Sequence, residues 1–238
     1  ALEVSGAQIA YVMPAHQFPV GTVMPMKRRL SLLAWAAREE GRYLLEDDYD
    51  SEFRYKGKPI PALQGFDNAQ RVIYLGTFSR AIAPSIRVSY MVLPESLMPQ
   101  YLRSGKNFSA TVSKTDQKIL EVFLREGYFE RHLNRMRALY KTKHDLLMRQ
   151  LKAFQGICTV SGEHAGVHVL LKLTNGLSGR EAVRLAAGAG IRVYCLKDYY
   201  IRETETRDDT VMIGYAAMPE EEIPKACEAL RKAWTHIG

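Results

Sequence analysis

Two stretches of this chain decide its fold, namely residues 46–53, which read EDDYDSEF, and residues 76–90, which read GTFSRAIAPSIRVSY. A predicted strand, Tyr43–Glu46, delivers the first stretch at its carboxyl end, and a second predicted strand, Arg71–Leu75, leads into the other. Ligands of open α/β sheets gather at the carboxyl ends of the strands. We therefore expect both stretches to lie at a functional edge of a sheet.

Acidic side chains crowd the first stretch, at Glu46, Asp47, Asp48, Asp50 and Glu52. Taken alone, such a cluster fits a solvated acidic loop or a divalent-metal site. A phenol stands two residues beyond Asp47, at Tyr49. Together with the second stretch, Tyr49 favours a different use, in which Asp47 keeps a pyridine nitrogen protonated and Tyr49 hydrogen-bonds a ring hydroxyl.

The second stretch offers hydroxyl groups at Thr77 and Ser79 and a guanidinium group at Arg87. A phosphate dianion binds hydroxyl donors and a bidentate guanidinium, and the backbone N–H groups of a strand-to-helix turn can add to them. The combined set suits a phosphorylated pyridine aldehyde, pyridoxal phosphate. A structural salt bridge to one of the acids is the alternative role for Arg87.

A third stretch, residues 14–25, reads PAHQFPVGTVMP. The three stretches together resemble the aminotransferase-like effector domain of MocR/GabR-type transcription regulators of the GntR family. These are fold type I pyridoxal-phosphate proteins fused to a winged-helix DNA-binding domain, and the resemblance runs almost end to end. Phe18 precedes Pro19-x-Gly21 where ordinary aminotransferases have an asparagine, which favours the regulator branch.

The resemblance places Arg80 at the position of the lysine that forms the Schiff base with the cofactor. A guanidinium keeps its proton, with a pKa above about 12, so it is no nucleophile for the aldehyde. The resemblance therefore implies cofactor binding without covalent attachment, and an effector domain without turnover rather than an enzyme. Three roles are open for Arg80: it binds phosphate, caps a helix, or pairs with Asp47 in the cofactor site. The sequence also leaves open whether Arg80 is natural or an engineered replacement of lysine.

Effector contacts are also implied by the resemblance. His16 and Gln17 lie in the matched loop and are expected to line the pocket, although a structural loop histidine is the alternative for His16. Asp198 falls where some similar proteins carry an arginine for the effector's carboxylate, so this chain is expected to hold a different effector or to hold it in another way. His164 and His168 are not expected to bind a metal, because Gly166 and a predicted strand interrupt a helical ligand pair.

The predicted fold is α/β, the C-terminal part of a fold type I aminotransferase-like large domain followed by a small α/β subdomain. Residues 1–95 would form the partial large, cofactor-binding domain, and residues 96–238 the linking helices and the small subdomain. The expected strands are Ala7–Met13, Tyr43–Glu46, Arg71–Leu75, Val88–Leu93, Val167–Leu173, Ile191–Cys195 and Thr210–Tyr215. The expected helices are Met26–Glu40, Ser113–Glu126, Tyr128–Phe154, Ser178–Ala189 and Glu220–Trp234. The first helix should have Leu30, Leu33, Ala34 and Ala37 on one face, and Ser178 should be the N-cap of the fourth.

Composition supports a cytoplasmic globular piece of a larger protein. The 238 residues are 47% apolar, no run approaches a membrane span of about 20 residues, and three distant cysteines indicate reduced core thiols. The net charge of +7 is spread over helical faces such as Lys27–Arg29 and the series of Arg131, Arg135, Arg137, Lys141 and Lys143, which fits solvated faces better than a DNA-binding surface. No winged helix is recognisable, so the chain is expected to be a C-terminal fragment that reaches DNA only through an upstream domain.

The main hypothesis is a ligand-sensing domain of a bacterial transcription regulator that binds pyridoxal phosphate, an amino-compound effector, or both, and forms a homodimer. The alternative is a fragment of a pyridoxal-phosphate-dependent aminotransferase, for which Phe18 and Arg80 are both awkward. A third possibility is an interaction module that kept the fold and lost the cofactor. The sequence leaves open the effector, the regulated genes and the sign of regulation.

Overall fold

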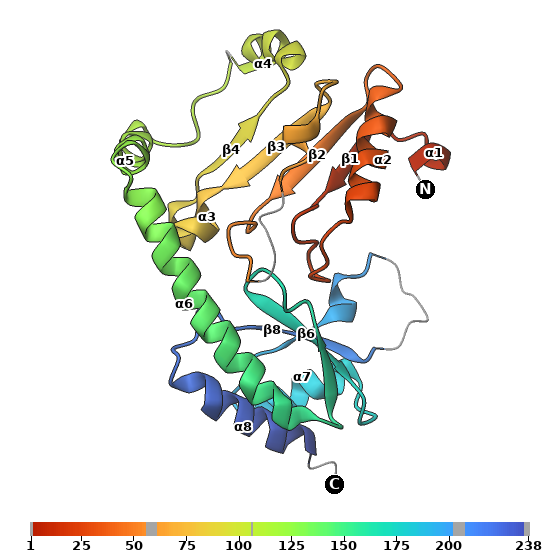
Figure 1. The fold of residues 1–238 in the computed structure, drawn as a ribbon, viewed down its shortest axis with the longest axis vertical. Helices are drawn as coiled ribbons and strands as arrows, with labels where there is room; N and C mark the ends of the chain where they lie inside the picture. Colours follow the sequence, from red (N-terminus) through yellow and green to blue (C-terminus); the bar gives the residue numbers. More distant parts are fainter. Residues whose placement is uncertain (1, 56–60, 106, 202–207, 236–238) are drawn as a thin grey trace. The chain divides into compact units, whose positions relative to one another are not determined.

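The computed structural model describes residues 2–55, 61–105, 107–201 and 208–235 (Figure 1). Contacts within the chain divide it into two compact units. Unit 1 comprises Ala1–Gln17, Val23–Glu52 and Lys58–Met136, and unit 2 comprises Phe18–Thr22, Phe53–Gly57 and Arg137–Gly238. We predicted a domain boundary between residues 95 and 96. The division by contacts does not test where the folding domains begin and end, so this boundary stays a prediction.

Unit 1 is built on a four-stranded sheet with the strand order β1-β2-β3-β4. Its strands are β1 (Ile9–Val12), β2 (Tyr43–Asp48), β3 (Val72–Thr77) and β4 (Ser89–Val92). The first three are parallel, and β4 pairs antiparallel with β3. All four were predicted, but β2 and β3 each continue two residues further than expected, so Asp47, Asp48 and Thr77 belong to the sheet itself.

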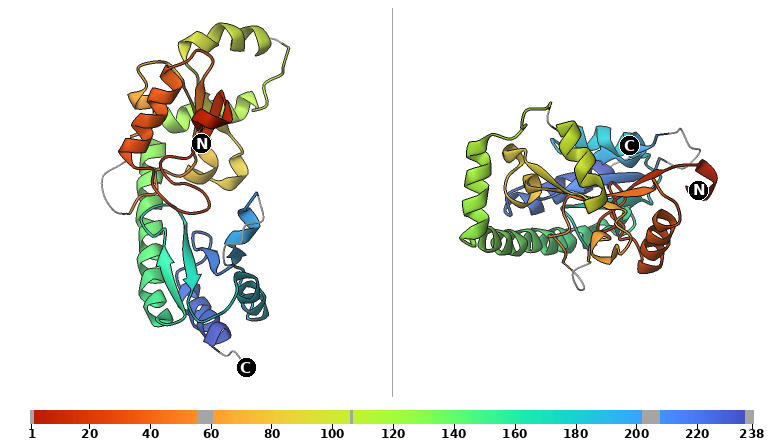
Figure 2. Two further views of the ribbon diagram at one scale, coloured as in Figure 1. Left: turned by 90° about the vertical axis from the view of Figure 1, so that its right-hand side faces the viewer. Right: turned by 90° about the horizontal axis from the view of Figure 1, so that it is seen from above.

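Helix α2 (Met26–Ala37) lies along one face of this sheet (Figures 1 and 2). Its predicted contact face was mostly wrong, since Leu30 is 52% exposed and Ala34 and Ala37 are exposed, whereas Leu33 does pack against the core. The buried side chains of the helix are Arg29, Trp35 and Ala36. Trp35 and Ala36 join an apolar cluster with strand residues such as Leu44. The apolar pattern did not predict this face because one of its buried residues, Arg29, is charged.

Arg29 is buried because backbone carbonyl groups satisfy its guanidinium. Its Nε donates to the Met24 carbonyl at 3.0 Å, its Nη1 to the Pro61 carbonyl at 2.6 Å and its Nη2 to the Pro14 carbonyl at 2.6 Å. Arg29 therefore fastens the loop after β1 and the segment before residue 63 to helix α2. The expectation that it belongs to a solvated basic face was wrong.

Two further helices of unit 1 were predicted, namely α5 (Lys114–Arg125) and the first part of α6 (Tyr128–Leu151). The short helices α1 (Leu2–Ser5), α3 (Phe78–Ala81) and α4 (Met98–Gly105) were not predicted. Gly127, with φ of +68°, separates α5 from α6. Among the residues described, no helix is long and apolar enough to cross a membrane.

Unit 2 contains an antiparallel sheet with the order β5-β6-β8-β7. Its elements are β5 (Cys158–Ser161), β6 (His168–Leu173), β7 (Tyr194–Cys195), β8 (Thr210–Gly214), α7 (Gly179–Gly188), α8 (Glu222–Thr235) and the second part of α6. Strand β5 was missed, and β7 is shorter than predicted. Ser178 caps α7 as predicted, accepting from the Glu181 N–H at 3.2 Å.

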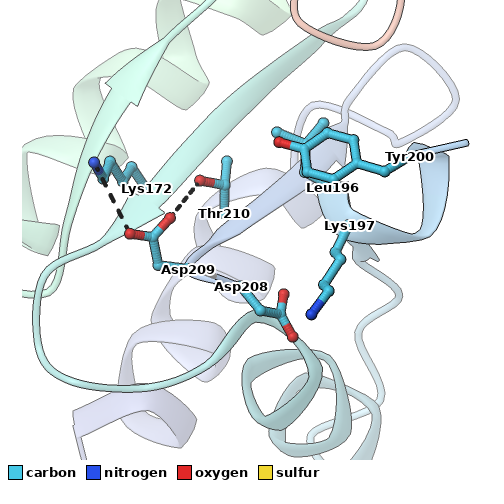
Figure 3. A pocket seen from close by; sticks show the side chains of 7 residues that line it. All are labelled: Lys172, Leu196, Lys197, Tyr200, Asp208, Asp209 and Thr210. Carbon is cyan, nitrogen blue, oxygen red and sulfur yellow. Dashed lines mark hydrogen bonds and ion pairs between the residues drawn. The ribbon is translucent and has the colours of Figure 1, made fainter. Parts of the chain in front are cut away.

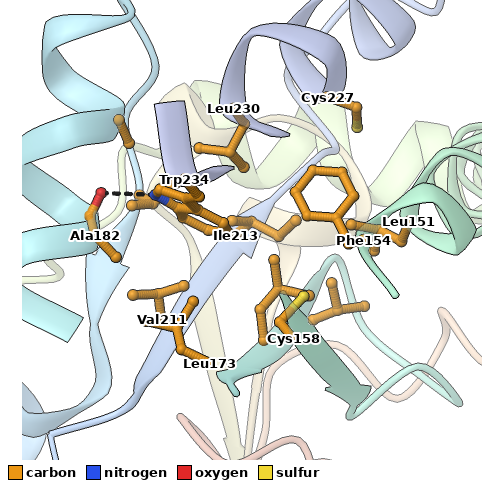
Figure 4. Packing of buried hydrophobic residues seen from close by; sticks show 14 of the residues in the cluster. Leu151, Phe154, Cys158, Leu173, Ala182, Val211, Ile213, Cys227, Leu230 and Trp234 are labelled. Carbon is orange, nitrogen blue, oxygen red and sulfur yellow. Dashed lines mark hydrogen bonds between the residues drawn. The ribbon is translucent and has the colours of Figure 1, made fainter. Parts of the chain in front are cut away.

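The core of unit 2 is one continuous apolar cluster between its sheet and its helices (Figure 4). Trp234 is fully buried there, packs edge-to-face on Phe154 and donates from Nε1 to the Ala182 carbonyl at 3.0 Å. Leu147 and Leu151 of α6 are buried in this cluster. The three cysteines are free and buried, as predicted: Cys158, Cys195 and Cys227.

Candidate functional site

Parallel pairing of β2 and β3 brings the two deciding stretches together at one edge of the unit 1 sheet. Asp47 pairs with Leu75 and Asp48 with Gly76, so the acidic residues lie beside the start of the turn that follows β3. Because the carboxyl ends of parallel strands share one sheet edge, this is where a ligand of an α/β sheet is expected. The predicted neighbourhood of Asp47 and Thr77 therefore exists in the fold.

Asp47 and Asp48 point to opposite faces of the sheet and differ in how many partners they have. Asp48 accepts from Ser51 through both oxygens, at 3.2 Å from the backbone N–H and 2.7 Å from the hydroxyl, and from the Tyr74 hydroxyl at 2.9 Å. Asp47 accepts one hydrogen bond, from the Tyr11 hydroxyl to its Oδ2. Within the described part of the chain, the Oδ1 atom of Asp47 has no protein hydrogen-bond donor, so Asp47 is the carboxylate with an oxygen open to a ligand.

Tyr49 is held by the loop that contains His16. Its hydroxyl donates to the His16 carbonyl at 3.1 Å and lies 3.2 Å from the His16 Nδ1. The same Nδ1 lies 2.8 Å from the Asp50 Oδ2, and both of these side chains are buried. Burial, followed by the charge of Asp50, raises the pKa of Tyr49, so the phenol stays protonated near neutral pH.

The buried pair of His16 and Asp50 gives the histidine a clear structural function. Gln17 follows it in the same loop and is half-buried. Nothing in the contacts of the two residues tests whether they bind an effector, and that role stays a prediction. Sequence reasoning also missed Asp50 as the partner of His16, because 34 positions separate them.

Helix α3 forms the turn that was expected to hold phosphate. The Thr77 hydroxyl accepts from the Ser79 N–H at 3.1 Å and donates to the Val88 carbonyl at 3.3 Å, so its only proton is already used. Ser79 is half-buried, and Arg87 is exposed with a left-handed φ of +47°. The backbone N–H of Ser79 is thus used, whereas within the described part of the chain the Ser79 hydroxyl and the Arg87 guanidinium make no hydrogen bond or ion pair.

Gly76 leaves room for the ring of Tyr90, which lies on β4. A Cβ atom at residue 76 would overlap the outer end of that ring, so a side chain there would require the ring to move. Phe78 in turn packs on Tyr90 with a centroid distance of 5.3 Å. The aromatic layer therefore supports the backbone from which Ser79 and Arg80 project.

Arg80 is exposed at the end of α3. Its positive charge acts on the Tyr49 phenol and favours ionisation, although burial keeps the pKa of Tyr49 raised overall. No ion pair between Arg80 and Asp47, or between Arg87 and any acid, occurs among the described residues. The guanidinium of Arg80 therefore lies near the phenol without neutralising the open carboxylate.

Glu46 supports the site from the covered face of the sheet, a role that the sequence did not reveal. Its carboxylate accepts from the backbone N–H groups of Leu63 at 2.7 Å and Gln64 at 2.9 Å. Burial raises the pKa of Glu46, and these two hydrogen bonds oppose that rise. Glu46 is therefore a structural residue and not part of a solvated acidic loop.

Residues of unit 2 that were considered as ligands lie in different surroundings. Asp198 is exposed in a short helical turn. Leu196 and Lys197 of the same turn line a pocket of about 400 Å³ (Figure 3). That pocket is lined by Lys172, Leu196, Lys197, Tyr200, Asp208, Asp209 and Thr210. His168 is buried and lies 3.2 Å from the Pro19 carbonyl, whereas the side chain of His164 is 57% exposed. Phe18 packs on the small cluster of Leu170, Leu196 and Met212.

Comparison with known proteins supports the predicted resemblance. The sequence profile of aminotransferase class I and II matches residues 17–230. The uncharacterized HTH-type transcriptional regulator YhdI of Bacillus subtilis is 42% identical over 230 residues, which are 96% of this chain and 48% of the regulator. The probable rhizopine catabolism regulatory protein MocR of Rhizobium meliloti is 32% identical over 235 residues, or 95% and 46% of the two chains. The chain thus spans about half the length of these curated relatives.

Solved structures show the same fold. Kynurenine aminotransferase of Pyrococcus horikoshii superposes with a TM-score of 0.85 at 25% identity, covering 98% of this chain and 58% of the enzyme. The multiple substrate aminotransferase of Thermococcus profundus gives 0.84 at 25% identity, with the same coverage of 98% and 58%. These likenesses confirm the predicted α/β class and the fold type I architecture. The chain therefore belongs to the aminotransferase class I and II family, as a partial aminotransferase-like domain related to MocR-type HTH transcription regulators.

Proposed function

We propose that this chain is the ligand-sensing domain of a bacterial transcription regulator and that it holds pyridoxal phosphate without a covalent bond. The observation that carries the proposal is the sheet edge at which Asp47 has a carboxylate oxygen without a protein donor, and the resemblance places Arg80 at the position of the Schiff-base lysine. Relatives named as HTH-type regulators, at up to 42% identity, support the regulatory part of the proposal.

The residues at this edge fit the cofactor's groups one by one. Asp47 would accept from the protonated ring nitrogen, and Tyr49, protonated near neutral pH, would lie close to the ring hydroxyl. Ser79 and Arg87 would bind the phosphate, while Thr77 shapes their turn as the N-cap of α3. When bound, pyridoxal phosphate supplies an electron-withdrawing ring and an amine-reactive aldehyde.

Arg80 decides between sensing and turnover. A guanidinium does not lose its proton at physiological pH, so it cannot replace a lysine as the group that binds the aldehyde covalently. The chain's remaining residues can still bind and orient the ring. Sensing then needs only two conformations with different affinity for the ligand, which is a binding property and not a catalytic one.

The effector in this proposal is an amino compound, since an amine is what an aldehyde-bearing cofactor would recognise. His16, Gln17 and Asp198 are the candidate effector contacts, and the signal would reach DNA through a winged-helix domain of the longer protein. A homodimer is part of the same proposal. The second candidate, an aminotransferase fragment, is favoured by the enzymes that share the fold but needs a lysine where Arg80 stands.

A titration of pyridoxal phosphate into four proteins tests the proposal: the natural chain, Arg80→Lys, Asp47→Ala, and Asp145→Ala as an exposed control in unit 2. We expect saturable binding to the natural chain, and about tenfold or greater weakening in Asp47→Ala, because hydrogen bonds to charged groups contribute about 1.5–3 kcal/mol. Asp145→Ala should bind like the natural chain.

Covalent attachment is read separately, by mass spectrometry after borohydride reduction. We expect a cofactor adduct in Arg80→Lys at residue 80 and no such adduct in the natural chain. If neither protein binds pyridoxal phosphate saturably, the site is not a cofactor site and the proposal is wrong. A borohydride-stable adduct at a different lysine in the natural chain would overturn the noncovalent part alone.

A further inference from the structure

Tyr11 of β1 is the one hydrogen-bond donor that the described structure gives to Asp47. The register pairs Tyr11 with Leu45, and Asp47 lies two residues further along β2. Side chains two apart on a strand share a face, and diagonal neighbours on adjacent strands are within reach of an aromatic side chain. The Tyr11 ring therefore spans the diagonal and its hydroxyl donates to the Asp47 Oδ2.

The opposite face of the sheet repeats this arrangement with different consequences. Tyr74 pairs with Glu46, two residues before Asp48, and its hydroxyl reaches the Asp48 Oδ2 at 2.9 Å. Asp48 also accepts from Ser51 at both oxygens. Each tyrosine thus fixes the carboxylate two residues along the neighbouring strand, but only the Tyr11 partner keeps an oxygen that no described protein group uses.

The hydroxyl of Tyr11 remains protonated and can therefore act as a hydrogen-bond donor throughout the physiological pH range. Burial and the bond to Asp47 raise its pKa to about 12, so the hydroxyl keeps its proton across the physiological range. A carboxylate accepts at both oxygens, and a bond to Oδ2 limits rotation of the group. The side chain of Asp47 is held in this way before any ligand arrives, and preorganisation of that kind reduces the ordering cost of binding.

We propose that Tyr11 is a positioning residue that fixes the carboxylate of Asp47 so that its Oδ1 faces the protonated ring nitrogen of pyridoxal phosphate. The inference rests on the proposed function. Tyr11 acts through Asp47 and does not touch the ring nitrogen itself. Its contribution is therefore specific to ligands that carry a protonated nitrogen at that position.

The test compares two ligands, pyridoxal phosphate and its carbocyclic analogue in which a C–H group replaces the ring nitrogen. Four proteins are titrated with each: the natural chain, Tyr11→Phe, Asp47→Asn and the double variant. Tyr43→Phe is the matched control, since Tyr43 lies on the same face of β2 and its hydroxyl meets Arg71 at 3.5 Å instead of Asp47. Thermal unfolding of every variant checks that the fold is kept.

We expect Tyr11→Phe to weaken pyridoxal phosphate binding about 3- to 10-fold, because the Asp47 carboxylate loses the one hydrogen bond that positions it. Binding of the carbocyclic analogue should be unchanged, and Tyr43→Phe should match the natural chain with both ligands. The double variant should bind no more weakly than Asp47→Asn, because the two residues act as one unit.

Three results would overturn the role of Tyr11 while leaving the proposed function intact. The first is equal weakening of both ligands in Tyr11→Phe, which indicates a general structural effect. The second is an unchanged affinity of Tyr11→Phe for pyridoxal phosphate, and the third is that the effects of Tyr11→Phe and Asp47→Asn simply add. If the natural chain binds neither ligand, the proposed function fails and the role of Tyr11 fails with it.

Discussion

Units 1 and 2 stabilise their sheets in different ways. Unit 2 packs α6, α7 and α8 residues on its sheet in one continuous apolar cluster around Trp234 (Figure 4). Unit 1 has a smaller apolar cluster around Trp35 and buries the polar side chains of Arg29, Glu46 and Asp50. Apolar burial is non-directional, whereas hydrogen bonds fix orientation. Unit 2 also buries Lys143, His144 and His168, but these accompany a much larger apolar cluster. The difference teaches that unit 1 depends more on buried polar side chains, which place its loops and carboxylates, and unit 2 more on apolar cohesion.

The chain carries a separate fluorescent reporter for each half of this comparison. It has two tryptophans, Trp35 in unit 1 and Trp234 in unit 2, and both are buried. A Trp234→Phe background leaves Trp35 to report on unit 1, and a Trp35→Phe background leaves Trp234 to report on unit 2. Denaturant unfolding in the two backgrounds then measures each unit on its own probe.

The largest expected effect is that of Trp234→Ala on unit 2. Truncation removes a fully buried ring and its bond to the Ala182 carbonyl, and large-to-small core changes of this kind cost about 3–5 kcal/mol. Circular dichroism should show that unit 2 unfolds at a lower denaturant concentration than unit 1, whose unfolding is followed by the fluorescence of Trp35. Lys232→Ala, exposed on the same helix, is the control and should change stability little. A cost below about 1 kcal/mol would contradict the cohesive role of this core.

Arg29→Met should cost unit 1 about 2–4 kcal/mol, although it replaces a charge by an apolar side chain of similar length. The carbonyls of Met24, Pro61 and Pro14 lose their donor, and unsatisfied buried polar groups are expensive. Unfolding is followed by Trp35 fluorescence in the Trp234→Phe background. Arg28→Met, at the exposed neighbouring position, is the matched control. Equal midpoints for the two variants would show that the buried clamp does not stabilise unit 1.

Alkaline pH should weaken unit 2 by about 1–2 kcal/mol through its buried thiols. Burial raises the pKa of Cys158 and Cys227 from 9.0 to about 11, so the folded state keeps two protons that the unfolded chain releases first. Stability therefore falls as pH rises from about 9 to about 11, and solvent screening keeps the effect below the full value of 1.36 kcal/mol per pKa unit. Trp234 fluorescence in denaturant at pH 8 and pH 11 measures it. In a Cys158→Ala, Cys227→Ala double variant, the free energy of unfolding should fall less between pH 8 and pH 11. An equal fall in the double variant and the natural chain would show that the two thiols do not cause the pH dependence.

The smallest expected effects come from two matched helix caps, one in each unit. Ser113 caps α5 by accepting from the Asp116 N–H at 3.0 Å, and Ser178 caps α7 by accepting from the Glu181 N–H at 3.2 Å. Replacing an N-cap serine by alanine costs about 1 kcal/mol. Ser113→Ala should therefore shift the Trp35 signal and Ser178→Ala the Trp234 signal. An aspartate at either position should restore most of the loss, and failure of that rescue would speak against a capping role.

Local sequence patterns were enough to predict most elements of both units. Alternating and helical periodicity gave β1 to β4, α2, α5, α6, α7 and α8 near their observed positions. Parallel strands that end together gave the meeting of Asp47 with the turn after β3. Strand β5 and the buried face of α2 were not predicted in this way, and for α2 the reason is that the charged Arg29 occupies a buried position.

By itself the sequence determined the family, the order of elements and the identity of residue 80, because these depend on neighbours along the chain. The tertiary structure alone decided which polar groups meet. The Tyr11 hydroxyl and Asp47 are 36 positions apart, and His16 and Asp50 are 34 apart. Only the register of the strands and the path of the loops brings such groups within hydrogen-bonding distance. The physical reason is that side-chain partners across a sheet are set by long-range pairing, which leaves no period in the sequence.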